Sequence, residues 1–361
     1  MQVKKKNSKK QVLPYTAESF IRQKKLLIIK LKDLNIDIEE EEVAKITFLS
    51  RRKYNRYAHF PKGESFESRL LNWLKKNFET DERQAAMEIV KSISFISEDE
   101  LKSLALKTFH NAEDTIMSSI QNLSTLDWLS YLSAREIELM QSMKRSLFVA
   151  LADDIAFDYI RRYASFRYNF EKDNFVEYYK LNEESLDKLP DFDRVFLIDH
   201  FSGSGTTALS FREGAWDGKI PRFLSIWKKR LVDVTIYYCP EIISSIAEQN
   251  LNKNLIEFLK SKNGINLYVT PTIQISISKC LSQDGMPIIN EDSTVANLCF
   301  KYYDRVVEDK NTKLVGNIMY GYGRAGLTLV FESNCPNNSI PLLWNLDNNW
   351  YPLFPRVKHH R

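Results

Sequence analysis

Hydrophobic residues recur at two different spacings along the chain, and the change between them divides it in two. Over residues 17–143, apolar positions recur every three or four residues with few Gly or Pro, which predicts a series of amphipathic helices. Ser97 with Glu100 forms a capping box, which marks the start of one of these helices. Beyond residue 143, short apolar runs alternate with longer helical stretches. The pattern therefore predicts a helical module over 17–143 and a second domain over 144–361.

The short apolar runs of the second part have the composition of buried strands. They are rich in Val, Ile, Phe and Tyr and lie at 146–152, 194–199, 234–239, 265–271 and 327–333. Strands that alternate with helices predict an α/β fold with a largely parallel sheet flanked by helices. In such sheets ligands bind beyond the carboxyl ends of the strands, so the loops at these ends are the first places to look for a site.

Positive charge gathers at the N-terminal end. Residues 1–60 carry 15 Lys/Arg and 7 Asp/Glu, a balance of +8 in a chain whose net charge is +4. Residues 1–16 are Lys-rich and poor in apolar residues, which predicts a disordered basic tail. In "RRKYNRYAHF" (51–60) cations alternate with aromatic rings, a mixture that suits phosphate contacts and base stacking in a nucleic-acid complex. A solvated tail and an ordinary basic helix end are the alternative.

Several classes of protein are excluded by what the sequence lacks. No apolar stretch approaches the roughly 20 residues of a membrane span, and the basic N-terminus has no signal-peptide core. The four cysteines have no CxxC spacing, so neither a disulfide framework nor a zinc cluster is expected. We expect a soluble cytoplasmic protein that makes no membrane contact.

The segment "VFLIDHFSGSGTTALSF" (195–211) contains the strongest chemical signal. An apolar strand ends at Asp199, and a loop of small residues, Gly203–Thr207, is predicted to lead into a helix. Backbone N–H groups in such a loop bind phosphate, and the dipole of a following helix would add positive potential. Hydroxyl donors are supplied by Ser202, Ser204, Thr206 and Thr207. The acid upstream is placed to accept hydrogen bonds from a sugar.

The loop departs from three familiar motifs: the P-loop, the dinucleotide-binding pattern and the nucleophile elbow. A P-loop needs Lys after its last Gly, where this chain has Thr206. The dinucleotide pattern is formally met by Gly203, Gly205 and Ala208, but three residues separate it from the strand-end acid. A nucleophile elbow needs Gly where Ser202 stands.

The strand, acid and Gly-Thr-Thr loop resemble the phosphoribosyl-diphosphate motif of type I phosphoribosyltransferases. The resemblance implies that Asp199 is the first of two acids that bind the ribose hydroxyls, often with magnesium nearby, and that Gly203–Thr207 holds the 5′-phosphate. Two residues depart from the family pattern. His200 replaces the second acid, and Gly203 stands where the purine-salvage branch has a catalytic Asp.

A second resemblance concerns the C-terminal part. "LTLVFESNCPNNSIPLLW" (327–344), together with the helical N-terminal region and the glycine loop, is similar to a phosphoribosyltransferase-like family of bacterial conflict systems, PRTase-CE. The similarity extends over about residues 65–361. It implies a role in antiviral defence, in some members beside a reverse transcriptase, and leaves the reaction open.

Two further segments are candidate contributors to a site. Asp153 and Asp154 follow the first predicted strand and would hold a magnesium ion near a diphosphate, or else cap the helix that follows. The glycine-rich segment 316–326 is predicted either to cover the site as a lid, with Tyr320 or Tyr322 on a base and Arg324 on phosphate, or to form a turn before a strand.

These observations favour an effector that binds phosphoribosyl diphosphate or a nucleotide at residues 199–207. If it is an enzyme, Asp199 and His200 would be catalytic and would act at the anomeric carbon, with magnesium as the cofactor. The alternative is a sensor or scaffold without catalysis that relays a nucleotide signal to a protein partner. A third hypothesis makes the basic N-terminal region a nucleic-acid-binding surface.

Overall fold

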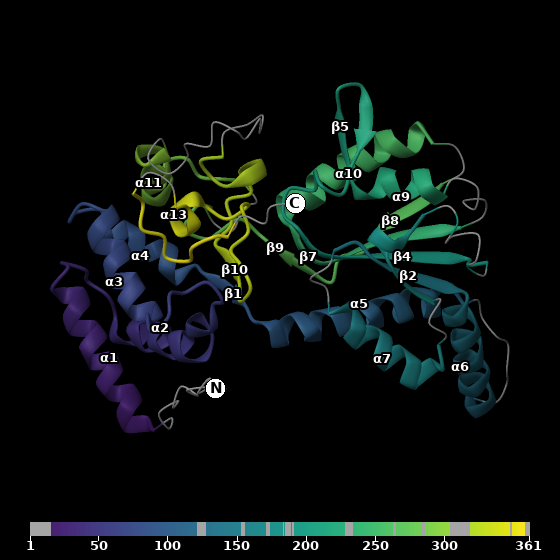
Figure 1. Cartoon of the computed structure of the whole chain (residues 1–361), viewed down its shortest axis with the longest axis horizontal. Helices are drawn as coiled ribbons and strands as arrows, with labels where there is room; N and C mark the ends of the chain where they lie inside the picture. Colours follow the sequence, from purple (N-terminus) through teal and green to yellow (C-terminus); the bar gives the residue numbers. More distant parts are fainter. Residues whose placement is uncertain are drawn as a thin grey trace, which may run out of the picture.

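The computed structural model describes most of the chain. The described residues are 16–120, 128–152, 156–170, 174–182, 184, 189, 191–227, 234–262, 265–283, 286, 288–303, 318–346 and 349–357. Asp153, Asp154 and the basic tail up to residue 15 lie outside them. The chain folds into a helical lobe and an α/β lobe that lie side by side (Figure 1).

A parallel sheet forms the centre of the α/β lobe, as the strand pattern predicts. Its strands follow the order β3–β2–β4–β7–β8, and a short strand, β9, pairs with the second half of β7. The bounds are β2 Ser146–Ala150, β3 Phe175–Glu177, β4 Arg194–Ser202, β7 Thr235–Ser244, β8 Asn266–Val269 and β9 Ile273–Ile275. Every pairing in this sheet is parallel. The predicted α/β fold class is confirmed.

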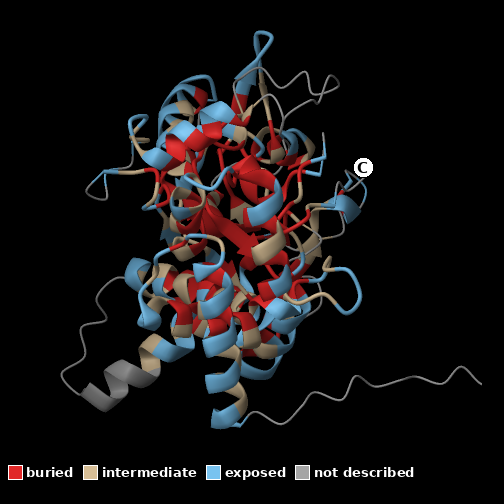
Figure 2. Ribbon diagram, turned by 90° about the vertical axis from the view of Figure 1, so that its left-hand side faces the viewer, coloured by how far each residue is buried: buried red, intermediate tan, exposed pale blue. Residues whose placement is uncertain are grey.

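Helices cover both faces of this sheet (Figure 1). On one face lie α9 (Lys219–Trp227) and α10 (Ser245–Lys260), and on the other lie α5 (Glu98–Ser119), α6 (Trp128–Lys144) and α7 (Phe157–Tyr168). Because both faces are covered, the central strands β4 and β7 are buried over most of their length, as Figure 2 shows. The sequence prediction ended the third strand at Cys239, whereas β7 continues to Ser244.

Helices form most of the helical lobe, and a two-stranded sheet lies between it and the α/β lobe. The helices of the helical lobe are α1 (Ala17–Lys32), α2 (Glu40–Arg52), α3 (Phe66–Asn77), α4 (Arg83–Lys91), α11 (Thr294–Lys301) and α13 (Pro341–Trp344). Between the lobes, β1 (Ser94–Ile96) pairs in parallel with β10 (Leu329–Phe331). The strand predicted at 327–333 therefore exists, but it pairs with β1 and does not join the central sheet.

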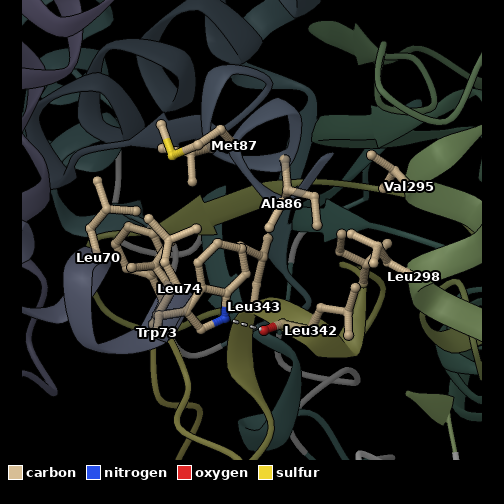
Figure 3. Packing of buried hydrophobic residues seen from close by; sticks show 14 of the residues in the cluster. Leu70, Trp73, Leu74, Ala86, Met87, Val295, Leu298, Leu342 and Leu343 are labelled. Carbon is tan, nitrogen blue, oxygen red and sulfur yellow. Dashed lines mark hydrogen bonds between the residues drawn. The ribbon is translucent and has the colours of Figure 1, made fainter. Parts of the chain in front are cut away.

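The core of the helical lobe is built from both ends of the chain. Figure 3 shows its centre, where α3 and α4 meet α11 and α13. The labelled side chains are Leu70, Trp73, Leu74, Ala86, Met87, Val295, Leu298, Leu342 and Leu343. Trp73 is fully buried, and its indole Nε1 donates to the Leu342 carbonyl at 2.9 Å. The predicted modules 17–143 and 144–361 thus share this core, while α5 and α6 of the first pack against the central sheet.

The capping box predicted at Ser97 is confirmed, and it fixes the start of α5. The Ser97 hydroxyl accepts from the Glu100 N–H at 3.3 Å, and the Glu100 carboxylate accepts from the Ser97 N–H at 2.8 Å. We expect Ser97→Ala to lower the free energy of unfolding by about 1 kcal/mol. Chemical denaturation measures this. Ser103→Ala, at an exposed position of the same helix, is the control, and an equal loss in both variants would contradict the capping role.

Candidate functional site

The glycine loop lies where the sequence analysis places it, at the carboxyl end of β4. Two side chains from neighbouring elements donate hydrogen bonds to its backbone carbonyls. The Ser244 hydroxyl donates to the Gly203 carbonyl at 2.5 Å, and the Asn250 side chain donates to the Ser204 carbonyl at 3.0 Å. Both donors stand at or beyond the end of β7, the strand that pairs with β4. The loop is therefore fixed to the carboxyl edge of the sheet, where ligands bind in this class of fold.

The helix predicted directly after the loop is not formed. The chain makes one turn, in which the N–H groups of Ala208 and Leu209 donate to the Gly205 carbonyl, and then enters a hairpin. The hairpin pairs β5 (Ser210–Arg212) with β6 (Ala215–Asp217). Its turn residues Glu213 and Gly214 have φ values of 52° and 80°, a left-handed pair that a helix cannot contain. No helix dipole follows the loop directly, so its anion-binding capacity depends on its own backbone and neighbouring side chains.

The backbone of the loop presents hydrogen-bond donors. Among the residues that the structure describes, none of the N–H groups from Ser204 to Thr207 donates to a protein acceptor. Gly205 has a φ of 76°, and a left-handed residue within such a run folds successive N–H groups into an anion-binding concavity. Gly205 is buried, Thr206 is half-buried and Thr207 is exposed, so the donors extend from the interior to the surface.

The glycine-rich segment predicted as a lid or a turn packs directly on this loop. The Tyr322 hydroxyl lies 3.2 Å from the Thr206 hydroxyl, which in turn lies 2.9 Å from the Ser204 hydroxyl. A Cβ on Gly323 would lie 2.5 Å from the Ser204 Cβ, and one on Gly203 would lie 2.1 Å from Asn338 Oδ1. The absence of side chains at these two glycines therefore allows the close approach.

Arg324, predicted to bind phosphate, forms no hydrogen bond to the glycine loop. Its guanidinium is half exposed and pairs with Glu291, with Nη2 and Oε1 2.5 Å apart. A different arginine faces the loop: Arg212 Nη2 donates to the Tyr322 hydroxyl at 3.3 Å. The sequence gives no sign of Arg212 as a site residue, because the local pattern predicts a helix where the structure has a hairpin.

Asp199, the predicted ribose-binding acid, is engaged within the protein. Its side chain is almost completely buried; Oδ1 accepts from Lys219 Nζ at 2.7 Å, and Oδ2 accepts from the Tyr238 hydroxyl at 2.9 Å. Burial, together with the charge of Asp199, raises the pKa of Tyr238 well above its ordinary value, so this phenol stays protonated and donates. Both oxygens of the carboxylate thus have protein partners.

His200 belongs to a separate contact on the other face of β4. Successive side chains of a strand point to opposite faces, and His200 accordingly packs away from the Lys219 contact. Its ring lies 4.7 Å from that of Phe331, and its Nδ1 lies 3.3 Å from Glu241 Oε2. Both His200 and Glu241 are buried. The two residues predicted to act together, Asp199 and His200, do not share one site surface.

The magnesium site expected from the resemblance does not fit Asp199. A metal ligand needs an available carboxylate oxygen, and the ammonium of Lys219 already balances this charge. Within the described residues, no group of three or more His, Cys, Asp or Glu side chains is arranged to hold a metal ion. The other predicted ligands, Asp153 and Asp154, lie outside that part of the chain.

The tyrosines of the basic segment 51–60 point into the protein and offer no stacking surface. Tyr54 and Tyr57 are buried in the helical lobe, so the prediction that they stack on nucleic-acid bases is wrong. Two cations next to them are paired: Lys53 with Glu100, and Arg56 with both Glu332 and Asp99. Cations and aromatic residues alternate here because the aromatic side chains are buried, whereas the cations form ion pairs with acidic side chains.

Comparison with known proteins agrees with this architecture. The family model described as PRTase-CE matches residues 70–356, which include the glycine loop, Lys219 and the segments that pack on the loop. α1 and α2 precede the matched region. No curated protein and no solved structure gave a significant match. Among the described helices, none is long and apolar enough to span a membrane. The chain belongs to the PRTase-CE family and is a phosphoribosyltransferase-like protein.

Proposed function

We propose that this protein binds a phosphorylated ligand at the loop Gly203–Thr207. The observation that supports this most strongly is the run of backbone N–H groups from Ser204 to Thr207 without protein acceptors. A donor that is buried without an acceptor costs about 1–3 kcal/mol, and a bound anion would offset that cost for the buried part of the loop. The hydroxyls of Ser204, Thr206 and Thr207 add donors along the same edge.

The family points to the class of ligand. A phosphoribosyltransferase-like protein has a loop of this kind for the 5′-phosphate of a sugar, so the ligand is a phosphoribosyl compound, such as phosphoribosyl diphosphate, or a nucleotide. The biological setting that we propose is bacterial antiviral defence, in which such ligand binding switches an effector or reports on the nucleotide pool.

One observation favours binding without turnover over transfer chemistry. Asp199, the acid expected to contact ribose, is bound to Lys219 and Tyr238 and is buried. An enzyme acting at the anomeric carbon would have to break this ion pair before Asp199 could reach a sugar hydroxyl. We therefore rank a nucleotide-sensing role first and a phosphoribosyl or glycosyl transfer reaction second.

Calorimetry with ribose 5-phosphate and with ribose tests the binding proposal. We expect saturable binding of the phosphate ester only, because the loop recognises the phosphate. We expect Thr206→Ala to weaken it by about tenfold, the loss of one hydrogen bond to a charged group. Ser225→Ala, at an exposed position of α9, is the control. Equal affinity for ribose and its phosphate would contradict the proposal.

Incubation with phosphoribosyl diphosphate separates the two functional alternatives. Release of diphosphate together with ribose 5-phosphate, both detected by mass spectrometry, would establish chemistry at the anomeric carbon with water as the acceptor. We expect binding of the intact compound without release of diphosphate, because Asp199 is held in its ion pair with Lys219.

A further inference from the structure

The glycine loop lacks the lysine that a P-loop carries within its own sequence, and the fold supplies one from elsewhere. We propose that Lys219 is the cation that contacts the phosphate at this loop, and that Asp199 and Tyr238 position it there. The ligand is a dianionic phosphate monoester. This inference rests on the proposed function of the loop and names a residue that none of the sequence motifs indicates.

The backbone around Lys219 is attached to the loop. The Lys219 N–H donates to the Thr207 carbonyl at 2.9 Å, and the next N–H donates to the Ala208 carbonyl at 3.0 Å. Gly218 lies so close that a Cβ there would be 2.5 Å from the Ala208 carbonyl oxygen. The first turn of α9 is therefore built directly onto the end of the glycine loop.

The side chain of Lys219 leads back toward the start of the loop. Its backbone contacts Thr207, at the end of the loop, whereas its ammonium contacts Asp199, four residues before Gly203. Lys219 thus links the last residue of the loop to Asp199, which precedes the loop on β4. The side chain of Lys219 is 17% exposed against 4% for Asp199, so the cation is the more accessible partner.

The ammonium has donors to spare. A lysine carries three N–H donors, and among the described residues Asp199 Oδ1 is the only acceptor within hydrogen-bond distance of Lys219 Nζ. The carboxylate holds the ammonium in place and leaves its remaining donors for a phosphate oxygen. Tyr238 holds the other carboxylate oxygen, which restricts the rotation of Asp199. In this arrangement Asp199 is a positioning residue rather than a contact to ribose.

Affinity for ribose 5-phosphate as a function of pH tests the proposal on the full chain. The second ionisation of a phosphate monoester has a pKa of about 6, so the dianion forms between pH 5 and 7.5. Wild-type affinity should rise over this interval. We expect Lys219→Met to weaken binding at pH 7.5 by about 30-fold, the loss of a charge-assisted hydrogen bond, and to flatten the pH dependence. Lys219→Arg keeps the charge and should stay within about threefold of wild type.

Loss of Lys219 leaves Asp199 buried without its cation, so Lys219→Met is paired with Lys219→Met/Asp199→Asn, which replaces the ion pair by neutral groups of similar size. A folded double variant with flat pH dependence supports the proposal. Wild-type affinity and pH dependence in either folded variant would overturn it. If Thr206→Ala nevertheless weakened binding, the loop would remain the phosphate site and only the role of Lys219 would be wrong. No binding of ribose 5-phosphate by wild type would overturn the proposed function and this inference together.

Discussion

A fragment of residues 16–143 should fail to fold cooperatively. The apolar side chains of the helices α1–α4 share one hydrophobic cluster with side chains that lie between residues 277 and 354. Without them Trp73 and its neighbours would face water, and its indole N–H would lose the Leu342 carbonyl. Each large aliphatic or aromatic side chain left exposed forfeits about 1.5–3 kcal/mol of burial. Thermal unfolding followed by circular dichroism should show no cooperative transition.

Trp73→Ala in the full chain measures the same core without truncation. We expect the free energy of unfolding to fall by about 3–5 kcal/mol, the usual cost of removing a large buried ring. A fragment that melts as sharply as the full chain, or a Trp73→Ala variant of unchanged stability, would contradict the shared core.

Gly218→Ala should also destabilise the protein strongly. Gly218 has a φ of 124°, and an added Cβ would lie 2.5 Å from the Ala208 carbonyl oxygen and 2.9 Å from the Thr207 carbonyl oxygen. Both neighbours are backbone, so the clash is not relieved by turning a side chain. Backbone strain and displacement of the loop together should cost about 3 kcal/mol or more, as measured by denaturant unfolding.

Gly214→Ala is the matched control for this prediction. Gly214 also has positive φ, 80°, but a Cβ there meets nothing within 4 Å. It therefore incurs the conformational strain without the clash, and we expect a loss of about 1 kcal/mol. Equal losses at the two positions would show that the close packing between α9 and the loop is not important for stability.

The sequence predicts those parts of the fold that depend on local patterns. Strands β2, β4, β7 and β8 follow from continuous apolar runs, and the start of α5 follows from its capping residues. The position of the glycine loop follows from the strand before it. The hairpin after the loop has a local signal too, because Glu213–Gly214 resembles the Asp-Gly pair of tight turns. The apolar residues of "TTALSF" alone predict a helix there.

Contacts between distant segments are not visible in such patterns. The pairing of β1 with β10 joins residues more than 200 positions apart, and neither strand shows in its own sequence which edge it will take. Lys219 is likewise an ordinary lysine at the start of a helix until the fold brings it to Asp199. The sequence therefore points to the loop but not to the side chains that complete the site.

The most direct test of phosphate binding observes the loop N–H groups themselves. In protein labelled with [15N]glycine and [15N]threonine, we expect addition of ribose 5-phosphate to shift the amide resonances of Gly205, Thr206 and Thr207 more than those of Gly63 and Gly214, which lie in other turns. Saturating shifts confined to the loop would support the account. Unchanged loop resonances at ligand concentrations that saturate binding by calorimetry would contradict it, because the phosphate would then be bound elsewhere.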